Sequence, residues 1–293
     1  MTDSMTTLDS ATVQHLQSWV DKTETLHDTI SPAPVRGYSV TLDRDDPLPE
    51  RDSVVPPLGH WFYFLPQHLQ REIGPDGHAK RGGFLPPVPL PRRMWAGSRL
   101  NWEVHNPLRV GEDVQRVSRI ASVTHKSGRT GDLLFVVVRH EVFNAQGLAL
   151  SDEHDIVYRA AAQPNDAPPP PVAARDDALW RREIVGDPVL LFRYSALTFN
   201  GHRIHYDRSY VTEVEGYPGL IVHGPLIATL LVDLVRRHKP DAPIRHFHFK
   251  AVRPTFDLHP FHVNARPTQD PHIIDVWAND HEGWLTMQGQ VHL

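Results

Sequence analysis

The sequence contains no cysteine, which excludes disulfide bonds, cysteine nucleophiles and thiolate-bound metals together. It also lacks a long apolar run. The longest, from Leu226 to Val235, is about half of the roughly 20 residues needed to span a bilayer, and Asp233 interrupts it. The segment from Met1 to Ser10 is polar, with neither a positively charged lead nor an apolar core, so we expect no secretory signal. These absences predict a soluble, cytoplasmic protein.

Lysine is scarce as well. Only five of the 30 basic residues are lysines, which leaves 25 arginines. Arginine forms two-pronged contacts with phosphates and carboxylates, although a GC-rich genome produces the same bias. The net charge of −5 and the isoelectric point near 6.5 give no general attraction to nucleic acid or anionic membranes. We therefore expect neither of them as a partner.

A proline-rich segment divides the chain, whose 293 residues suffice for one large domain or two modest ones. The segment from Gln163 to Val172 contains four consecutive prolines, which cannot join a helix or a central strand. We predict an N-terminal domain at 1–162, a proline-rich linker at 163–175 and a C-terminal domain at 176–293.

Hydrophobic periodicity predicts the elements before the linker. Residues 11–30 have helical spacing, and 60–73 is a short ordered piece between two loops rich in proline, glycine and charge, 43–60 and 74–92. Alternating and continuous apolar runs predict consecutive strands, with a hairpin turn at Asn144–Gly147. These strands are expected at 98–105, 113–125, 132–143 and 148–160.

One helix dominates the prediction for the C-terminal part. The predicted helix covers 225–239, with Gly224 at its N-cap and Pro225 at its first position. Its apolar residues cover so much of its circumference that the helix must be nearly enclosed. Strands are predicted around it at 189–196, 244–252, 260–267, 272–278 and 284–292. Both parts of the chain contain a strand, a proline-marked loop and another strand, which suggests two copies of one fold.

The first chemical motif is Asn200-Gly-His202-Arg203-Ile-His205-Tyr-Asp207. Hydration of an enoyl thioester needs a group that exchanges a proton near neutral pH, and histidine is suited to this task. Asn200 could hold the water by accepting a hydrogen bond from it. Alternatively, these side chains satisfy one another in a turn and the histidines only pack.

The second motif is the His223-Gly224-Pro225 segment at the start of the enclosed helix. A ligand can approach bare backbone N–H groups there, at the positive end of the helix dipole. A thioester carbonyl held by the Gly224 N–H would be stabilised as it becomes enolate-like. The alternative is an ordinary Gly-Pro helix start. The two motifs lie about 20 residues apart, and together they are more specific than either alone.

With these motifs the sequence resembles the MaoC-related hydratases and dehydratases, whose signature is Asp-x-Asn-x-x-His-x-Asp followed by His-Gly. His205 and Asp207 match the His-x-Asp part, and His223-Gly224 matches the His-Gly pair. The likeness is closest to the type 2 3-hydroxyacyl-thioester dehydratases, which include hydratases of mesaconyl-C4-CoA and itaconyl-CoA. Four further segments share this resemblance: Arg92-Arg-Met-Trp-Ala-Gly97, Val136-Val-Val-Arg-His-Glu141, Asp155-Ile-Val-Tyr-Arg159 and Arg193-Tyr-Ser-Ala-Leu-Thr-Phe199.

The resemblance implies an α+β double hot-dog, two antiparallel sheets each wrapped around a central helix, with a degenerate site in the N-terminal half. The working site would lie in the C-terminal half. One position departs from the family, because Asn200 stands where the acid is expected. Thr198 or another side chain could fill the acid's place. We expect His205, Asn200 and Gly224 to be catalytic. We expect Arg203, which suits a substrate carboxylate, to bind substrate with His202, His223 and Thr198.

The expected activity is that of a hydro-lyase: reversible hydration of an enoyl thioester to the 3-hydroxyacyl thioester, including C5-dicarboxylyl esters. Coenzyme A would enter only as part of the substrate, no other cofactor is expected, and the chain could form a homodimer. Histidine spacings such as His246-x-His248 fit a metal, but scattered acids and absent cysteines make us expect none. The alternatives are a hot-dog acyl-CoA thioesterase and a non-catalytic acyl-binding subunit.

Overall fold

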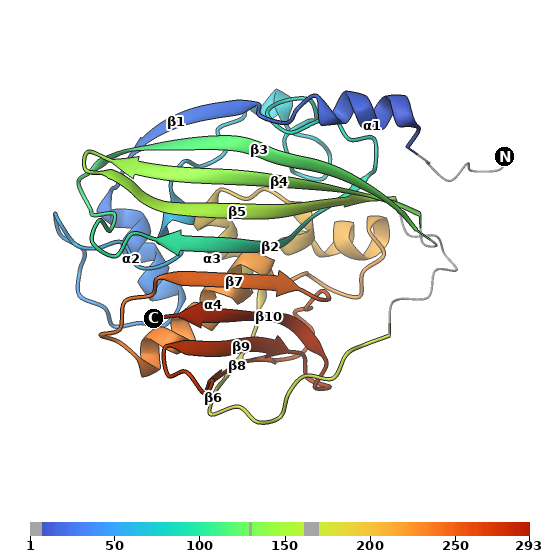
Figure 1. Ribbon diagram of the computed structural model, residues 1–293. Helices are drawn as coiled ribbons and strands as arrows, with labels where there is room; N and C mark the ends of the chain where they lie inside the picture. The colour runs from blue at the N-terminus through green and yellow to red at the C-terminus, as the bar shows by residue number, and fades with distance from the viewer. Residues whose placement is uncertain (1–7, 129–130, 161–169) are drawn as a thin grey trace.

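A single antiparallel sheet of ten strands forms the framework of the protein (Figure 1). The computed structural model describes residues 8–128, 131–160 and 170–293. The strand order is β1-β3-β4-β5-β2-β7-β10-β9-β8-β6. The strands are β1 (Thr23–Thr29), β2 (Arg92–Trp102), β3 (Asp113–Gly128), β4 (Gly131–Asn144), β5 (Gly147–Arg159), β6 (Trp180–Ile184), β7 (His246–Ala251), β8 (Phe261–Pro267), β9 (Ile273–Asn279) and β10 (Leu285–His292).

The two halves of the sheet join where β2 pairs with β7, and we call this pairing the seam. It runs from Gly97 opposite Lys250 to Asn101 opposite His246. A Cβ atom at Gly97 would lie 2.3 Å from the Phe249 carbonyl oxygen, so a side chain there would force the strands apart. The two predicted sheets are therefore continuous, edge to edge.

The C-terminal half wraps β6–β10 around the long helix α4 (Gly224–His238). Every residue from Leu226 to Val235 is buried, because apolar side chains surround the whole circumference of the helix. The predicted helix at 225–239 is confirmed, and so are the four strands expected after it.

The N-terminal half has longer strands and a shorter helix. Helix α2 (Pro32–Thr41) packs against α3 (Pro188–Thr198) and against η1 (Gly59–Phe62), a short 3-10 helix. Val35 of α2 contributes to a core with the inner faces of β3–β5, whereas Tyr38 belongs to the core around α4. The α+β double hot-dog is confirmed, with two unequal helices beneath one sheet.

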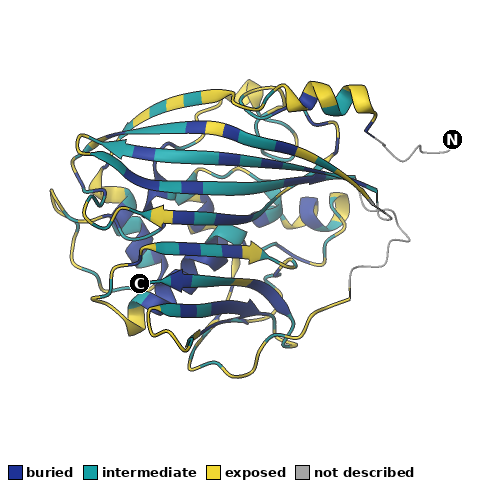
Figure 2. Ribbon diagram, viewed as in Figure 1, coloured by how far each residue is buried: buried dark blue, intermediate teal, exposed yellow. Residues whose placement is uncertain are grey.

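Two predicted elements differ from the structure, one over part of its length and the other entirely. The helix expected at 11–30 ends early: α1 covers Ser10–Gln17, and β1 follows with alternating exposure along β3 (Figure 2). The strand expected at 189–196 is α3, because the Asp187 side chain accepts from the N–H groups of Val189 and Leu190 and so caps a helix that begins with proline. Strand β6 was not predicted. The ordered piece at 60–73 contains parts of η1 and η2 (Gln70–Glu72).

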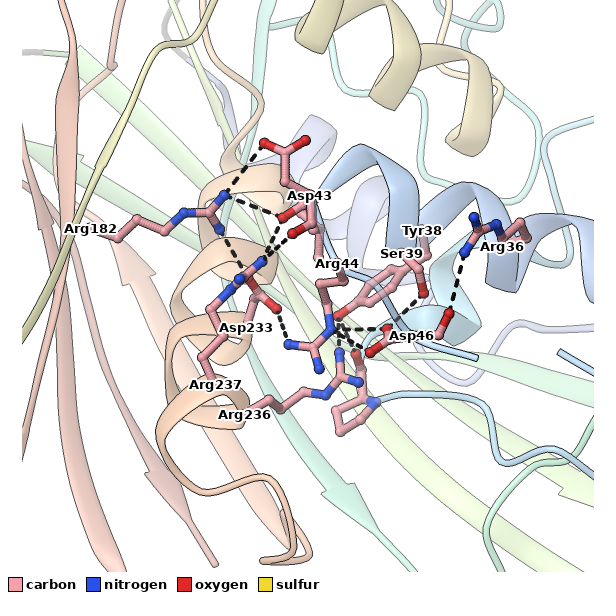
Figure 3. A network of polar contacts seen from close by, with 12 residues as sticks. Arg36, Tyr38, Ser39, Asp43, Arg44, Asp46, Arg182, Asp233, Arg236 and Arg237 are labelled. Atoms are coloured by element: carbon pink, nitrogen blue, oxygen red, sulfur yellow. Dashed lines mark hydrogen bonds and ion pairs between the residues drawn. The ribbon is translucent and has the colours of Figure 1, made fainter. Parts of the chain in front are cut away.

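A buried aspartate on α4 binds three arginines and links the helix to distant segments (Figure 3). Asp233 is fully buried and pairs with Arg44 at 2.9 Å, Arg182 at 3.1 Å and Arg237 at 2.7 Å. Arg44 follows α2 and Arg182 lies on β6, so this cluster joins both halves of the chain. A buried carboxylate is tolerated only with such partners.

The proposed domain limits remain a prediction. Residues 161–169, which include the first two of the four consecutive prolines, lie outside the described part of the chain. The seam also makes the two predicted domains share one sheet. In the described part of the chain, no helix combines the length and apolar character needed to cross a membrane.

Candidate active site

The predicted motif forms a compact turn, residues 200–207, which we call the histidine turn. Helix α3 ends at Thr198, and the C-cap residue Phe199 has a left-handed backbone with φ of 48° that redirects the chain. The side-chain oxygen of Asn200 then accepts from the His202 N–H at 3.0 Å, which closes an Asx turn. The short 3-10 helix η3 (Arg203–His205) follows and carries His205 inward.

His205 has the geometry of a neutral base. Its Nδ1–H donates to the Ile221 carbonyl at 2.7 Å, and this fixes the tautomer that leaves a lone pair on Nε2. Only 8% of the residue is exposed. Burial lowers the pKa of His205 to about 4, although the hydrogen bond to Ile221 opposes this shift. The side chain is therefore uncharged at neutral pH and can accept a proton.

His223 lies flat against His205. The two rings stack with centroids 3.7 Å apart and planes 16° from parallel. Nε2 of His223 shares a hydrogen bond of 2.8 Å with the hydroxyl of Ser195 on α3. Its Nδ1 is buried without a hydrogen-bond partner among the described residues. Buried polar atoms are nearly always hydrogen-bonded. This unpaired nitrogen is therefore available to a bound water or ligand.

Gly224 follows at once and begins α4. The first turn of a helix has N–H groups without intrahelical acceptors, at the positive end of the dipole. Outside the helix itself, a Cβ atom built on Gly224 would meet only the Met287 methyl group, at 4.0 Å. The helix start is therefore open enough for a carbonyl oxygen to approach.

Two predicted site residues are already engaged. The Thr198 hydroxyl donates to the Tyr194 carbonyl at 2.8 Å and completes the last turn of α3. The Arg203 guanidinium binds Asp207 at 2.7 Å, donates to the Pro75 carbonyl at 3.0 Å and lies over the Tyr210 ring. Their proposed contacts with substrate remain predictions, and neither group is free in this arrangement.

The structure adds a segment that the motifs did not reveal, residues 74–80, which we call the Asp76 loop. It belongs to the N-terminal half and lies on the histidine turn, where the backbone N–H of Arg203 donates to the Asp76 carbonyl oxygen at 2.9 Å. The ring centroids of His78 and His202 are 4.0 Å apart. The sequence predicts only a loop here, because no local pattern indicates which surface the loop contacts.

Another group of histidines lies away from the site. His246 and His248 of β7 and His292 of β10 have ring nitrogens within 4.8 Å of one another. His246 also shares a hydrogen bond of 2.9 Å with Asn101 across the seam. Elsewhere in the described residues, the rings of His259 and His281 stack with centroids 3.9 Å apart. The expectation of no metal remains a prediction.

Comparisons with known proteins define the enzyme class, which is that of hydro-lyases that add water to acyl thioesters or remove it from them. A family model described as hydroxyacyl-thioester dehydratase type 2 matches residues 58–257. The chain is 46% identical over 276 residues to the mesaconyl-C(4)-CoA hydratase of Chloroflexus aurantiacus, covering 94% of this chain and 97% of that protein. The chain therefore belongs to the hydroxyacyl-thioester dehydratase type 2 family, and it is a hydro-lyase.

Solved structures share the fold. A MaoC-like dehydratase superposes with a TM-score of 0.66 at 13% identity, covering 94% of this chain and 99% of that one. A Mycobacterium tuberculosis protein with a double hot-dog fold superposes with a TM-score of 0.56 at 12% identity, covering 93% and 95%. The predicted double hot-dog fold is thereby confirmed.

Proposed function

We propose that this enzyme reversibly hydrates a C5-dicarboxylyl enoyl-CoA such as mesaconyl-C4-CoA. The observation that carries the proposal is the His205 ring, whose tautomer is fixed by Ile221 and which stacks on His223 immediately before the start of α4. This arrangement sets a neutral base beside a site that can polarise a carbonyl. The similarity to a mesaconyl-C(4)-CoA hydratase supports the choice of acyl group.

In the hydration direction, the thioester carbonyl accepts a hydrogen bond from the Gly224 N–H. Nε2 of His205 takes a proton from water as the water oxygen bonds to the β-carbon, and the π electrons move toward the thioester oxygen. The resulting enolate is stabilised by the helix start. The imidazolium of His205 then returns its proton to the α-carbon, so that water is added and the enzyme is restored. Asn200, at the beginning of the histidine turn, is proposed to orient the water.

A dicarboxylyl substrate also needs a cation for its free carboxylate. Arg203 is paired with Asp207, so we propose Arg93, at the beginning of β2, for this contact. Burial and the neighbouring His78 and His205 are the main reasons that the pKa of His202 falls to about 2, and Arg93 also lowers it. The Arg93 charge therefore lies near the histidine turn. Burial raises the pKa of Tyr158 and a hydrogen bond from Arg93 opposes this rise, whereas no carboxylate pairs with Arg93 among the described residues.

The proposal is tested by incubating the protein with mesaconyl-C4-CoA, itaconyl-CoA and crotonyl-CoA while enoyl absorbance and free thiol are followed together. We expect loss of enoyl absorbance without thiol release, fastest with a dicarboxylyl ester. Thiol release with unchanged enoyl absorbance would instead identify a thioesterase. Tight binding of all three esters without turnover would identify an acyl-binding subunit.

The remaining expectations belong to the same proposal. We propose that coenzyme A enters as part of the substrate, that no other cofactor takes part, and that the enzyme is cytoplasmic and able to form a homodimer. The molecular mass in solution, measured by light scattering, checks the oligomeric state. A mass equal to one chain would contradict the dimer and leave the hydratase proposal unaffected.

A further inference from the structure

The active site has no carboxylate at the position where the resemblance predicts one. Asn200 occupies that position, and its side-chain oxygen already accepts from the His202 N–H. Among the described residues, His205 hydrogen-bonds to the Ile221 carbonyl and to no acidic side chain. A base with a pKa of about 4 nevertheless has to carry a proton during the reaction. A nearby negative charge would stabilise that protonated state.

The Asp76 loop brings a carboxylate to the histidine turn from the other half of the protein. Asp76 accepts from Nδ1–H of His78 at 3.0 Å and from the His78 backbone N–H at 3.0 Å. The Asp76 carboxylate and ring nitrogens of His78 and His202 all lie within 4.8 Å of one another. The His202 ring in turn meets the His205 ring edge to face, with centroids 5.4 Å apart. The four side chains form a continuous series from Asp76 to His205.

The loop is held in this position by backbone contacts. Besides the bond from the Arg203 N–H to the Asp76 carbonyl, the Arg203 side chain donates to the Pro75 carbonyl at 3.0 Å. Gly77 has a φ of 89°, and a Cβ atom there would lie 1.8 Å from the Gly201 carbonyl oxygen. Only glycine permits this approach of the two backbones. The loop is therefore fitted to the histidine turn at close range.

The charges around the series oppose proton uptake, apart from Asp76. Burial and the cations of Arg93 and Arg81 lower the pKa of His78, and the Asp76 hydrogen bond raises it. Burial also raises the pKa of Asp76, but the hydrogen bonds from His78 hold it well below its ordinary value, so it stays ionised. The charged or titratable groups facing the series are Arg81 of the segment before β2, Arg93 of β2, Arg203 and His205 of the histidine turn, Tyr210 of the π-helical turn η4 (Tyr210–Val214), and His223 at the start of α4.

We infer that Asp76 supplies, from the N-terminal half, the negative charge that Asn200 cannot provide, and that it acts on His205 through His78 and His202 as a positioning residue. The inference rests on the proposed hydratase function. When His205 takes the proton from water, positive charge develops at one end of the series and the Asp76 carboxylate lies at the other. The hydrogen bond from His78 to Asp76 also fixes the orientation of the ring that touches His202, in the way that carboxylates orient catalytic histidines elsewhere.

The main test is Asp76→Asn, which keeps the shape and removes the charge. It leaves one accepting oxygen where Asp76 offers two, one to the backbone N–H and one to the Nδ1–H of His78. We expect turnover to fall about 10- to 100-fold, as when a carboxylate that orients a metal-binding histidine is lost. The acid limb of the kcat/KM profile should also move to lower pH, because the protonated histidines lose a stabilising charge. The matched control is Glu72→Gln, which keeps the acceptor for the Leu69 N–H close to the same loop. An unmoved acid limb in Asp76→Asn would overturn the inference.

A second variant separates a chemical role from a structural one. Asn200→Asp restores a carboxylate at the position that carries it in the family. We expect Asn200→Asp to recover at least part of the turnover lost in Asp76→Asn, since either carboxylate can supply the charge. Failure of the correctly folded double variant to recover any turnover would contradict the inference. Activity that a chelator abolishes and Zn²⁺ restores would also overturn it, because the three side chains would then bind a metal.

One readout does not depend on turnover. The hydrogen bond between His78 and Asp76 predicts a low-field imidazole N–H proton resonance that is lost or shifted in Asp76→Asn and unchanged in Glu72→Gln. Its absence from the wild-type spectrum would contradict the inference by itself. If the wild-type enzyme hydrates none of the thioesters, the proposed function fails, whereas normal hydration with an unmoved acid limb in Asp76→Asn contradicts the inference alone.

Discussion

Each half of the molecule contains a set of buried histidines, and the two sets differ in what their polar atoms do. In the N-terminal half, Asp152 of β5 accepts from Trp61 at 2.8 Å and pairs with His154 at 2.7 Å and His60 at 3.3 Å. In the C-terminal half, His205 and His223 stack on each other with no carboxylate between them. Both sets leave a buried atom without a hydrogen-bond partner among the described residues, namely Nδ1 of His60 and Oδ1 of Asp152 in one half and Nδ1 of His223 in the other. The difference is the carboxylate, which pairs with the histidines of the N-terminal set and is missing beside His205.

The two halves also differ in how their helices cover the sheet. Helix α4 is enclosed by its sheet and offers its start to the site, whereas α2 covers only part of the inner face of the longer N-terminal strands. The short helix η1 packs against α2 and α3, and the Asp76 loop contacts the histidine turn. The N-terminal half therefore lies against the candidate site, and substitutions in each half distinguish a structural from a chemical role.

The largest effect is expected from His205→Ala. Loss of the general base should lower kcat about 10²- to 10⁴-fold with the fold retained. The matched control is His27→Ala, which removes an exposed histidine from β1 in the other half. Stopped-flow or steady-state hydration assays, together with circular dichroism, measure the two properties. Near-normal hydration by a folded His205→Ala enzyme would remove the C-terminal histidine from the mechanism.

Asp233→Ala tests the contact that joins the halves beneath the sheet. Three guanidinium groups would lose their shared buried partner, so the free energy of unfolding should fall by about 3–5 kcal/mol. The control is Asp241→Ala, an exposed acid just after α4, which should change stability by less than about 0.5 kcal/mol. Chemical denaturation measures both. An equal, small effect of the two substitutions would show that the arginines do not depend on Asp233.

Asp152→Asn asks whether the N-terminal set is structural. The amide keeps an acceptor but places a donor against the neighbouring His154 and Trp61, so stability should fall by about 1–3 kcal/mol. In the folded variant kcat should be unchanged, because no group of this set carries a proton in the proposed mechanism. A large loss of kcat without loss of stability would mean that the N-terminal half also takes part in the chemistry.

The pH dependence of stability sharpens the comparison further. Burial lowers the pKa of His205 to about 4 and also lowers the pKa of His60 in the other half. Below the ordinary histidine pKa of about 6.5 and down to the folded-state pKa of His205, the unfolded chain binds more protons than the folded one, so stability falls as pH decreases. Denaturation at about pH 7 and about pH 5 should show this loss, with a smaller loss in His205→Gln. A stability that rises on acidification would contradict neutral burial of these histidines.

Much of the fold could be predicted from local patterns. The enclosed helix at 225–239 and the strands after it follow from apolar spacing and from Gly224-Pro225, which matches α4 and β7–β10. The segment 189–196 was misassigned because a short apolar run fits a strand or a helix equally, and the cap at Asp187 decided the outcome. The seam could not be predicted, since it depends on pairing between distant strands.

In the candidate site, too, local motifs could be predicted from the sequence and contacts between distant segments could not. The motif around His205 and the His223-Gly224 pair could be found by spacing, and the structure brings them into contact. The Asp76 loop could not be found, because Asp76 and His202 are far apart in sequence and meet only when the two halves fold together. The ion pair between Arg203 and Asp207 could not be predicted either, since the sequence does not show which acid an arginine pairs with.

The most direct test of the account is the fate of water. The wild-type enzyme is incubated with mesaconyl-C4-CoA in water enriched in heavy oxygen, and the product is analysed by mass spectrometry. We predict an intact coenzyme A thioester that has gained one water, with the heavy oxygen in a new hydroxyl group on the β-carbon. Free coenzyme A together with a carboxylic acid that contains the heavy oxygen would contradict the account and identify thioester hydrolysis as the reaction.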